Sequence, residues 1–340
     1  MGGPTIAFPH PPPAIGGPGS FQSRLEEALQ KRGWRVVYAD AGVTPDVILV
    51  VAGTSKVGWL IRQKLRGVRI VHRLDGMSWR HRLPGPSRKK WFRAEATTTL
   101  MRFIRDSLAD HVVYQSEFIR RWWHRAFGPA RCPESLIYNG VDLKRFTPAP
   151  SAETGDTPPV LLCVEGTVES DPVTERVLAT VAGRLKEEGV IRGTIVCGRV
   201  SDETRQRLAR VPGLEFRGPV PREQMPSILA QPGAFLCLEI NAPCPNAVVE
   251  ALAAGLPVGG FDTGALRELV PPEAGILAPY RGDPFRLEEP DYELVVAAFR
   301  EIFARRAELA RGARAVAERC FSLDTMVEKY LVVLEAAMAR

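Results

Sequence analysis

Residues 241–270 read NAPCPNAVVEALAAGLPVGGFDTGALRELV, which is a polar turn, a short apolar helix and a second glycine-containing turn. Asn246 is a good N-cap for a helix over residues 247–254, and Glu250 then falls about one turn inside that helix. A helix N-terminus carries unpaired N–H groups and a partial positive charge, so a phosphate can bind there while a carboxylate accepts hydrogen bonds from ribose hydroxyls. The simpler alternative is an asparagine cap followed by a glutamate that suits the helix dipole.

Short apolar runs alternate with helical patterns along the rest of the chain. In the first half the expected strands read PTIAF, RVVYA, DVILVVAG, RIVHRL and HVVYQS, with helices over 21–32, 58–65 and 91–108. In the second half they read VLLCVEG, GTIVCG, LEFRG, AFLCLEI and PVGGFD, with further helices over 172–188, 202–210 and 222–230. These strands are too apolar to face water on either side, which predicts an α/β fold with doubly wound parallel sheets.

The length of 340 residues exceeds what one core usually accommodates, so two domains are expected. Residues 147–159, TPAPSAETGDTPP, have the composition of a linker. We therefore expect one domain over residues 1–150 and a second over 151–320, with a last helix within 321–340. The apolar spacing after Asp291 is typical of packing helices.

The charges are distributed unequally between these two parts. Residues 1–150 carry 24 Lys and Arg against 11 Asp and Glu, whereas the remainder carries 21 against 28. Eleven basic residues and one acid, Asp75, lie between Arg62 and Arg93, interleaved with Trp79, Trp91 and Phe92. Such a segment attracts anions, and it is either a solvated basic face or a binding surface for an anionic acceptor or phospholipid. Specific nucleic-acid binding is disfavoured because no recognised motif accompanies the charge.

Other residue types narrow the class further. The six cysteines show no CxxC spacing, and Cys163, Cys197 and Cys237 lie inside apolar runs, which predicts small core residues. His, Cys and acidic residues form no ligand cluster, so we predict neither a metal nor another cofactor. No apolar run is long enough for a membrane span and no leader is recognisable, so a cytoplasmic protein is expected, with peripheral contact at the inner membrane face left open.

Several segments, taken in order, carry a resemblance to a known family. They are GGPGSFQSRL at 16–25, VHRLDG at 71–76, YQSEFIRRWW at 114–123, IYNGVDLKRFTP at 137–148 and the stretch quoted first. Together they resemble the retaining family 4 glycosyltransferases. The resemblance implies a GT-B fold, in which two facing Rossmann-like domains enclose an interdomain cleft and the last helix returns to the first domain. It also implies metal-independent transfer of a sugar from a nucleotide-sugar donor to a hydroxyl acceptor.

The same resemblance assigns roles on the acceptor side. His72 and Asp75 end an apolar strand where the family places a side chain near the reacting sugar, so they are candidates for steering the acceptor hydroxyl. Each has a structural alternative, a hydrogen-bonded core histidine and an ordinary turn aspartate. The loop at Gly16 and Gly17 is expected to approach the donor diphosphate. Read as GxGxxG from Gly17, it puts Gln22 at the third glycine position, which argues against a nicotinamide-dependent oxidoreductase.

Donor contacts are assigned to the second domain. Glu250 is expected to hold the ribose, while Asn246 and the turn Thr263, Gly264 and Ala265 border the diphosphate and sugar. The base is expected near the backbone from Gly218 to Val220.

Three positions lack a charged residue of the family pattern. Thr167 and Asp171 occupy the places where the family commonly has an Arg and a Lys, and Ala242 replaces the first of two glutamates. Arg199, which follows the strand that ends at Gly198, is one candidate for the missing charge, and an Arg of the basic first domain is another. The missing cations also support an alternative from a different class, a non-catalytic sugar-nucleotide or polyanion-binding protein on the same scaffold.

Overall fold

The computed structural model describes residues 3–13, 16–85, 87–149, 158–168 and 172–339. The chain forms two compact units, one made of Met1–Gly140 with Leu323–Arg340 and the other of Val141–Ser322. The division expected at residues 150 and 151 falls at the edge of a segment, 150–157, that lies outside the described residues. The compact units divide instead between Gly140 and Val141.

The first unit is built on a parallel sheet of six strands in the order β2-β1-β3-β4-β5-β6. The strands are β1 Thr5–Phe8, β2 Arg35–Tyr38, β3 Val47–Val51, β4 Arg69–Leu74, β5 His111–Tyr114 and β6 Glu134–Leu136. The helices are α1 Gly17–Lys31, α2 Val57–Leu65, α3 Arg88–Phe103, α4 Glu117–Phe127 and α12 Leu323–Met338, with short helices η1 Arg80–Arg82 and η2 Ile104–Leu108. Connections through helices are what parallel strands require.

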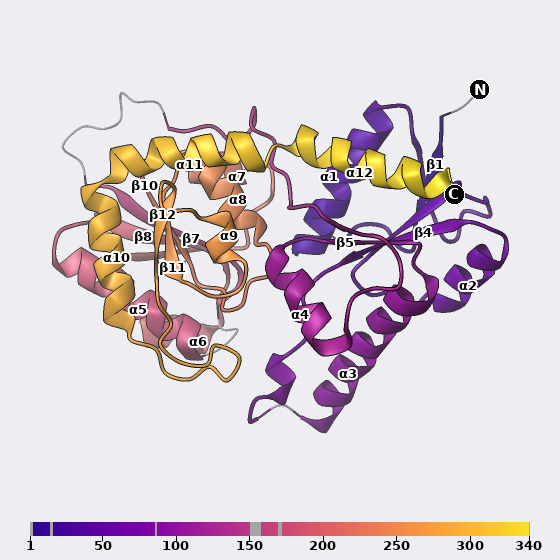
Figure 1. Ribbon diagram of the computed structural model, residues 1–340. Coiled ribbons are helices and arrows are strands. Elements are labelled where there is room, and N and C mark those ends of the chain that lie inside the picture. Colours follow the sequence, from indigo (N-terminus) through magenta and orange to yellow (C-terminus); the bar gives the residue numbers. More distant parts are fainter. Residues whose placement is uncertain (1–2, 14–15, 86, 150–157, 169–171, 340) are drawn as a thin grey trace. The chain divides into compact units, whose positions relative to one another are not determined.

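Helices cover both faces of this first sheet (Figure 1). The α1 and α12 helices share one core with β1 and β3, in which the rings of Phe21 and Tyr330 lie 5.2 Å apart between their centroids. The α2 helix and the end of α3 cover the other face, and Trp123 of α4 is buried in an adjoining cluster. The last helix of the chain thus completes the core of the first unit.

The second unit has another parallel sheet of six strands, in the order β12-β11-β10-β7-β8-β9. The strands are β7 Val160–Thr167, β8 Gly193–Arg199, β9 Leu214–Gly218, β10 Gly233–Cys237, β11 Val258–Phe261 and β12 Gly275–Ala278. The helices are α5 Pro172–Glu187, α6 Asp202–Leu208, α7 Met225–Leu229, α8 Asn246–Ala253, α9 Leu266–Leu269, α10 Tyr292–Ala304 and α11 Arg306–Cys320. Strand order reverses between β7 and β10, and ligands of such sheets bind at this switch point.

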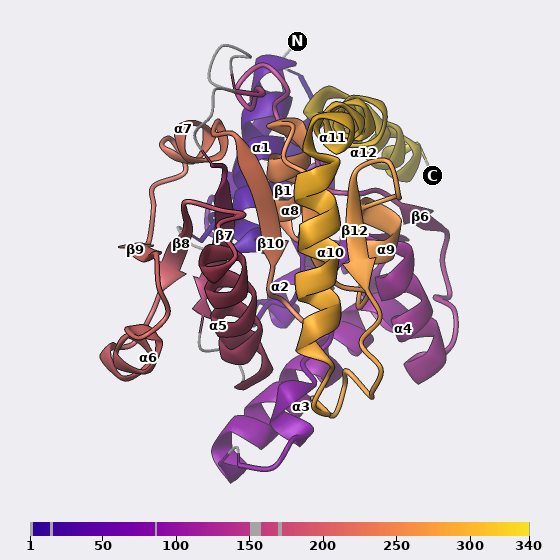
Figure 2. The same cartoon turned by 90° about the vertical axis from the view of Figure 1, so that its left-hand side faces the viewer.

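The second sheet is also enclosed between helices. Figure 2 shows α5 and α10 side by side over one face of the sheet, where the two helices pack against each other. The α8 helix packs on β10 and β11 from the other face and contacts α7 and α11. Cys163, Cys197 and Cys237 are buried in this sheet, as expected of small core residues.

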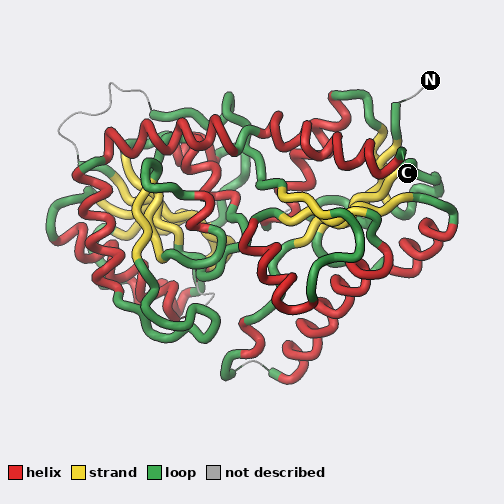
Figure 3. Tube along the Cα trace, viewed as in Figure 1, coloured by secondary structure: helices red, strands yellow, loops and turns green. Residues whose placement is uncertain are grey.

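The predicted fold of two Rossmann-like units with parallel sheets is confirmed (Figure 3). The expected helix over 91–108 is an α-helix followed by the π-helical turn η2. The helix expected over 222–230 is limited to Met225–Leu229. Strands β6 and β12 were not anticipated, because such short strands carry too little hydrophobic pattern to be recognised. Helices α4 and α9 were also not anticipated.

Two observations concern the whole described chain. Within it, no helix combines the length and the apolar character needed to cross a membrane. Over the same ranges, no three His, Cys, Asp or Glu side chains gather into a group that could hold a metal ion.

Candidate functional site

The carboxyl edge of the second sheet brings the predicted donor-binding residues together. Thr167, Arg199 and Gly218 end β7, β8 and β9, and the turn over 263–265 follows β11. Asn246 and Glu250 lie in helix α8, which comes after β10, whereas Gly16 and Gly17 belong to the first unit. In a parallel sheet all these ends meet along one edge, and the strand order reverses among them. This edge is where parallel sheets of this type bind their ligands.

Two turns at this edge are interlocked through their backbones. The Ala265 amide donates to the Ala242 carbonyl at 2.8 Å, and the Asn241 amide donates to the Thr263 hydroxyl at 3.2 Å. Gly264 has φ 62, and a Cβ atom there would lie 2.5 Å from the Ala242 nitrogen. Only glycine permits this approach, since both the backbone angle and the space exclude a side chain. The predicted turn over 263–265 is thus locked to the turn that leads into α8.

The start of α8 corrects the expected cap. Pro245, with an extended backbone, occupies the N-cap position, and its carbonyl accepts the first hydrogen bonds from Val248 and Val249. Asn246 already has a helical backbone, so its side chain does not cap the helix. Glu250 consequently lies in the second turn, where it is buried. The helix thus begins one residue earlier than expected.

Arg199 lies beside the position where a family cation is missing. Thr167 of β7 and Arg199 of β8 are direct partners in the parallel register, and Arg199 is exposed. Neighbouring strands are about 4.8 Å apart, so the guanidinium can reach the space in front of Thr167. Within the described ranges no carboxylate pairs with Arg199. Asp171, the second departure from the family pattern, lies outside the described residues.

Gly218 is the last residue of β9 and Val220 follows it at the end of the same edge. Gly218 has φ 68, an angle that favours glycine, and both residues are partly exposed. Ala242, the third departure, is completely buried, so a carboxylate could not replace it without rearrangement. At the carboxyl edge, the end of β9 therefore presents mainly backbone atoms, at Gly218, whereas the end of β8 presents the charged side chain of Arg199.

The glycine loop of the first unit follows β1 and opens α1. Gly16 has φ 102 and is the N-cap residue of the helix, and Gly17 is its first residue. A Cβ atom at Gly19 would lie 2.1 Å from the Pro13 carbonyl oxygen. The loop therefore needs glycine at Gly16 for its backbone angle and at Gly19 for close packing.

Arg73 is a buried cation that sequence reasoning left unassigned. Its guanidinium pairs with Asp75 and donates to Gln115 at 2.6 Å and to Asn139 at 2.8 Å. It also lies 4.0 Å above the ring of Phe21, in helix α1. The Arg73 side chain thus contacts residues that follow β4 and β5 and also Phe21 of α1, the helix that the glycine loop opens. Arg73 therefore does not belong to the exposed basic segment in which the sequence placed it.

Asp75 is held in place from two directions. Its carboxylate pairs with Arg73, while its backbone carbonyl accepts a hydrogen bond from the Trp123 indole at 3.0 Å. The carboxylate keeps some exposure, so it can meet a ligand. Of the two predicted acceptor-side residues, Asp75 has the accessible group.

His72 precedes Arg73 in β4, and its side chain is fully buried on the opposite face of that strand from Arg73. Its Nε2 lies 2.7 Å from the carbonyl oxygen of Ala52, a residue with φ 55. A carbonyl only accepts, so Nε2 carries the proton, and Nδ1 is buried without a hydrogen-bond partner among the described residues. Burial lowers the pKa of His72 to about 4, the Ala52 hydrogen bond opposes this shift, and the charge of Arg105 adds to it. This geometry matches the structural alternative, since a ring without exposed surface cannot contact an acceptor.

The low pKa of His72 predicts how stability depends on pH. In the unfolded chain this histidine is protonated below about pH 6.5, whereas in the folded chain it is protonated only below about pH 4. The free energy of unfolding should therefore decrease as the pH falls through this window, by on the order of 3 kcal/mol in total. Urea unfolding at pH 4–7, followed by tryptophan fluorescence, measures this directly, because all six tryptophans lie in residues 1–140. His72→Gln removes the titration and should flatten the profile; an unchanged slope would contradict the assignment.

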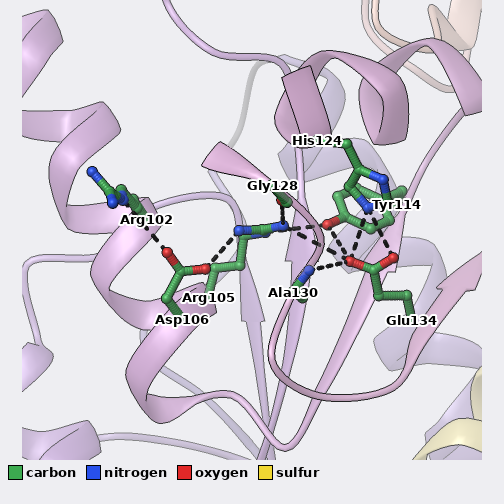
Figure 4. Close-up of polar contacts among 8 residues, drawn as sticks. All are labelled: Arg102, Arg105, Asp106, Tyr114, His124, Gly128, Ala130 and Glu134. Carbon is green, nitrogen blue, oxygen red and sulfur yellow. Dashed lines mark hydrogen bonds and ion pairs between the residues drawn. The ribbon is translucent and has the colours of Figure 1, made fainter. Parts of the chain in front are cut away.

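The first unit contains a second buried arginine, Arg105. Arg105 lies in the π-helical turn η2, and Figure 4 shows its guanidinium among acceptors from several elements. It donates to the hydroxyl of Tyr114 at 3.1 Å, to the carboxylate of Asp106 at 2.6 Å and to the carbonyl of Gly128 at 2.5 Å. The side chain is completely buried, so a ligand cannot reach this group and its role is structural. Burial would raise the pKa of Glu134, but hydrogen bonds from Ala130, His124 and Tyr114 lower it overall.

Comparisons with known proteins place the chain in a family. The family model Glycosyl transferases group 1 matches residues 159–289, and the model Glycosyltransferase Family 4 matches residues 4–145. A search of curated protein sequences gives no match.

Solved structures share the fold over nearly the whole chain. Sucrose-phosphate synthase from Thermosynechococcus elongatus has a TM-score of 0.78 and 17% identity, covering 99% of each chain. HepE from Anabaena, in complex with UDP and glucose, has a TM-score of 0.70 and 18% identity, covering 98% of this chain and 100% of that one. A glycosyltransferase from Rickettsia africae has a TM-score of 0.66 and 13% identity over 98% of each chain. With one family match over each sheet and this shared fold, the protein belongs to the family 4-like glycosyltransferases.

Proposed function

We propose that the protein transfers a sugar from a nucleotide-sugar donor to a hydroxyl acceptor with retention of anomeric configuration and without a metal ion. The observation that carries this proposal is the gathering of Arg199, Glu250 and the turn over 263–265 at the carboxyl edge of one sheet. Support for the donor class comes from HepE, which shares the fold and has been solved with UDP-glucose.

The donor would lie along the edge from β9 to β11. The backbone near Gly218 and Val220 would face the base, and Glu250 would accept hydrogen bonds from the ribose hydroxyls. Asn246 and the turn over 263–265 would border the diphosphate and the sugar. Gly264 is suited to this place because it presents backbone without a side chain, and its amide has no hydrogen-bond acceptor in the described chain.

Departure of a nucleoside diphosphate needs groups that stabilise growing negative charge. Arg199 is the side chain that we assign to this task, since it lies beside Thr167 at the switch-point end of β8. Thr167, its neighbour on β7, has a hydroxyl group where the family has a cation. The missing charge is therefore supplied from the adjacent strand.

On the acceptor side, the accessible carboxylate of Asp75 would accept a hydrogen bond from the attacking hydroxyl. Arg73 holds that carboxylate, and its cross-links to Gln115 and Asn139 keep it fixed. His72 would support the strand from the core. The glycine loop at Gly16 and Gly17 would approach the donor diphosphate through its backbone.

The proposal is tested by incubating the protein with a panel of nucleotide sugars, including UDP-glucose, and measuring nucleoside diphosphate release with and without EDTA. Release with at least one donor, insensitive to EDTA, is the expected result. Tight binding without release for every donor would instead support the non-catalytic alternative. The anomeric configuration of the product, read by NMR, checks retention.

Arg199→Ala should lower kcat/KM for the active donor roughly tenfold to a hundredfold, because a charge-assisted contact contributes about 1.5 to 3 kcal/mol. Arg199→Lys should recover part of the loss, since it keeps the charge but not the planar fork. Arg210→Ala is the matched control, an exposed arginine of the same unit outside the candidate site. Equal rates for the Arg199→Ala and Arg210→Ala variants would remove Arg199 from the mechanism.

A further inference from the structure

Helix α3 of the first unit begins with six consecutive exposed residues that neither the core nor the candidate site uses. They are Arg88, Lys89, Lys90, Trp91, Phe92 and Arg93, and the two aromatic residues are 41% and 66% exposed. Within the described chain, none of these four cations forms an ion pair. Both charge and aromatic surface are therefore available at one end of the helix.

The position of these cations does not serve the helix itself. A helix N-terminus carries partial positive charge and favours acids, yet the first turn of α3 contains no acid. The Ser87 side chain caps the helix by accepting from the Lys90 amide. The capping residue thus supports the helix, while the four basic residues oppose its dipole.

An uncharged stripe runs from this end along the exposed side of α3. Phe92, Ala96, Thr99 and Phe103 are all exposed and recur at the spacing of one helix face. Thr98 and Met101 are buried on the other side. The stripe extends for about 16 Å, and Phe103 at its far end is 41% exposed.

The single acid of α3 does not interrupt this surface. Glu95 accepts hydrogen bonds from His81 at 2.8 Å and from Arg82 at 2.9 Å, and both of these residues lie in η1. These contacts neutralise the carboxylate locally. The exposed side of α3 is therefore basic at its start, and it presents Phe92 and Phe103 at the two ends of an uncharged row of residues.

We propose that α3 lies on an anionic phospholipid surface, with the four cations at the phosphates and the aromatic residues at the boundary between headgroups and acyl chains. Basic residues next to exposed aromatic side chains are what peripheral proteins place against anionic lipids. A soluble polyanion would engage the cations but would leave Phe92 and Phe103 in water. An anionic bilayer engages both, so it is the partner that the surface fits.

Vesicle flotation measures this directly with the full-length protein and no nucleotide. The protein should float with vesicles of phosphatidylglycerol and phosphatidylcholine, and should not float with phosphatidylcholine alone. Each basic residue near an anionic surface contributes roughly fivefold to partitioning, so replacing all four by glutamine should weaken binding by roughly a hundredfold or more. Replacing Phe92 and Phe103 by serine should weaken it roughly tenfold at unchanged charge.

The matched control removes the same charge elsewhere on the first unit. Arg35, Arg125, Arg131 and Lys329 are exposed and lie outside α3. Their replacement by glutamine should leave binding within about threefold of the parent, because surface potential falls off within a Debye length. Equal loss in both quadruple variants would reduce the effect to net charge and overturn the proposal.

Two further outcomes would also overturn it. One is equal flotation with neutral and anionic vesicles. The other is full retention of binding by the Phe92 and Phe103 variant together with capture by a soluble polyphosphate, which would identify a polyanion site. Because the assay contains no sugar donor, a negative result leaves the transferase proposal standing, and loss of transfer activity leaves this one standing.

Discussion

Replacing Arg105 by methionine is expected to lower the free energy of unfolding of the first unit by about 3 to 5 kcal/mol. The guanidinium is completely buried and serves the hydroxyl of Tyr114, the carboxylate of Asp106 and the carbonyl of Gly128 at once. Methionine would fill most of the volume but would leave these acceptors without their donor. Urea unfolding followed by tryptophan fluorescence reports on this unit alone, because residues 1–140 contain every tryptophan of the chain.

Arg102→Met is the matched control for that measurement. Arg102 lies one turn earlier, loses the same charge and pairs with the same Asp106, but its side chain is 54% exposed. An exposed i,i+4 pair contributes less than about 1 kcal/mol, so this variant should unfold close to the parent. If the two variants differed by less than about 1 kcal/mol, the buried network shown in Figure 4 would not be the source of stability.

Gly264→Ala is expected to separate the two interlocked turns of the second unit and to lower nucleoside diphosphate release at least about tenfold. The residue has φ 62, and the added Cβ would lie 2.6 Å or less from backbone atoms of Asn241 and Ala242. Backbone angle and overpacking together cost about 2 to 5 kcal/mol. Since backbone atoms cannot turn aside as a flexible side chain can, the hydrogen bond between Ala265 and Ala242 should weaken.

Hydrogen exchange measured by mass spectrometry tests this locally. Peptides that cover residues 238–246 and 262–270 should exchange faster in the variant, whereas peptides from the first unit should not change. Gly189→Ala is the control, since Gly189 has φ 71 with no atom within 4 Å of its added Cβ. It should show only the backbone cost and normal turnover. Similar exchange in both variants would show that the close approach at Gly264 is unimportant.

Local pattern was sufficient for much of the fold. The strand RIVHRL was recovered at its observed bounds, Arg69–Leu74, and LEFRG at Leu214–Gly218. Buried parallel strands read as short apolar runs wherever they occur, so their recognition needs no tertiary information. Strand β12, GILA at Gly275–Ala278, was not predicted, because four residues between turns are too few to show the alternation of apolar and polar residues.

Only part of the candidate site could be predicted from the sequence pattern. The turn over 263–265 and the helix that contains Glu250 could be recognised from their residue types and order. The cap of α8 could not, because asparagine is a preferred N-cap residue, yet Asn246 is already the first residue of the helix. Arg73 and Arg105 were missed for a different reason, since arginine is ordinarily a surface residue and its burial depends on partners that are distant in sequence.

The amino-acid sequence by itself determined the alternation of strands and helices, the two Rossmann-like units and the family, because hydrophobic period and motif order are properties of neighbouring residues. Tertiary structure alone decided which strand stands beside which. The register that sets Arg199 next to Thr167 joins residues 32 positions apart, and the arginine that holds Asp75 does so with help from Gln115 and Asn139. Such contacts form only when parallel strands meet at a common edge, so the chemistry of the site is settled by packing and not by local pattern.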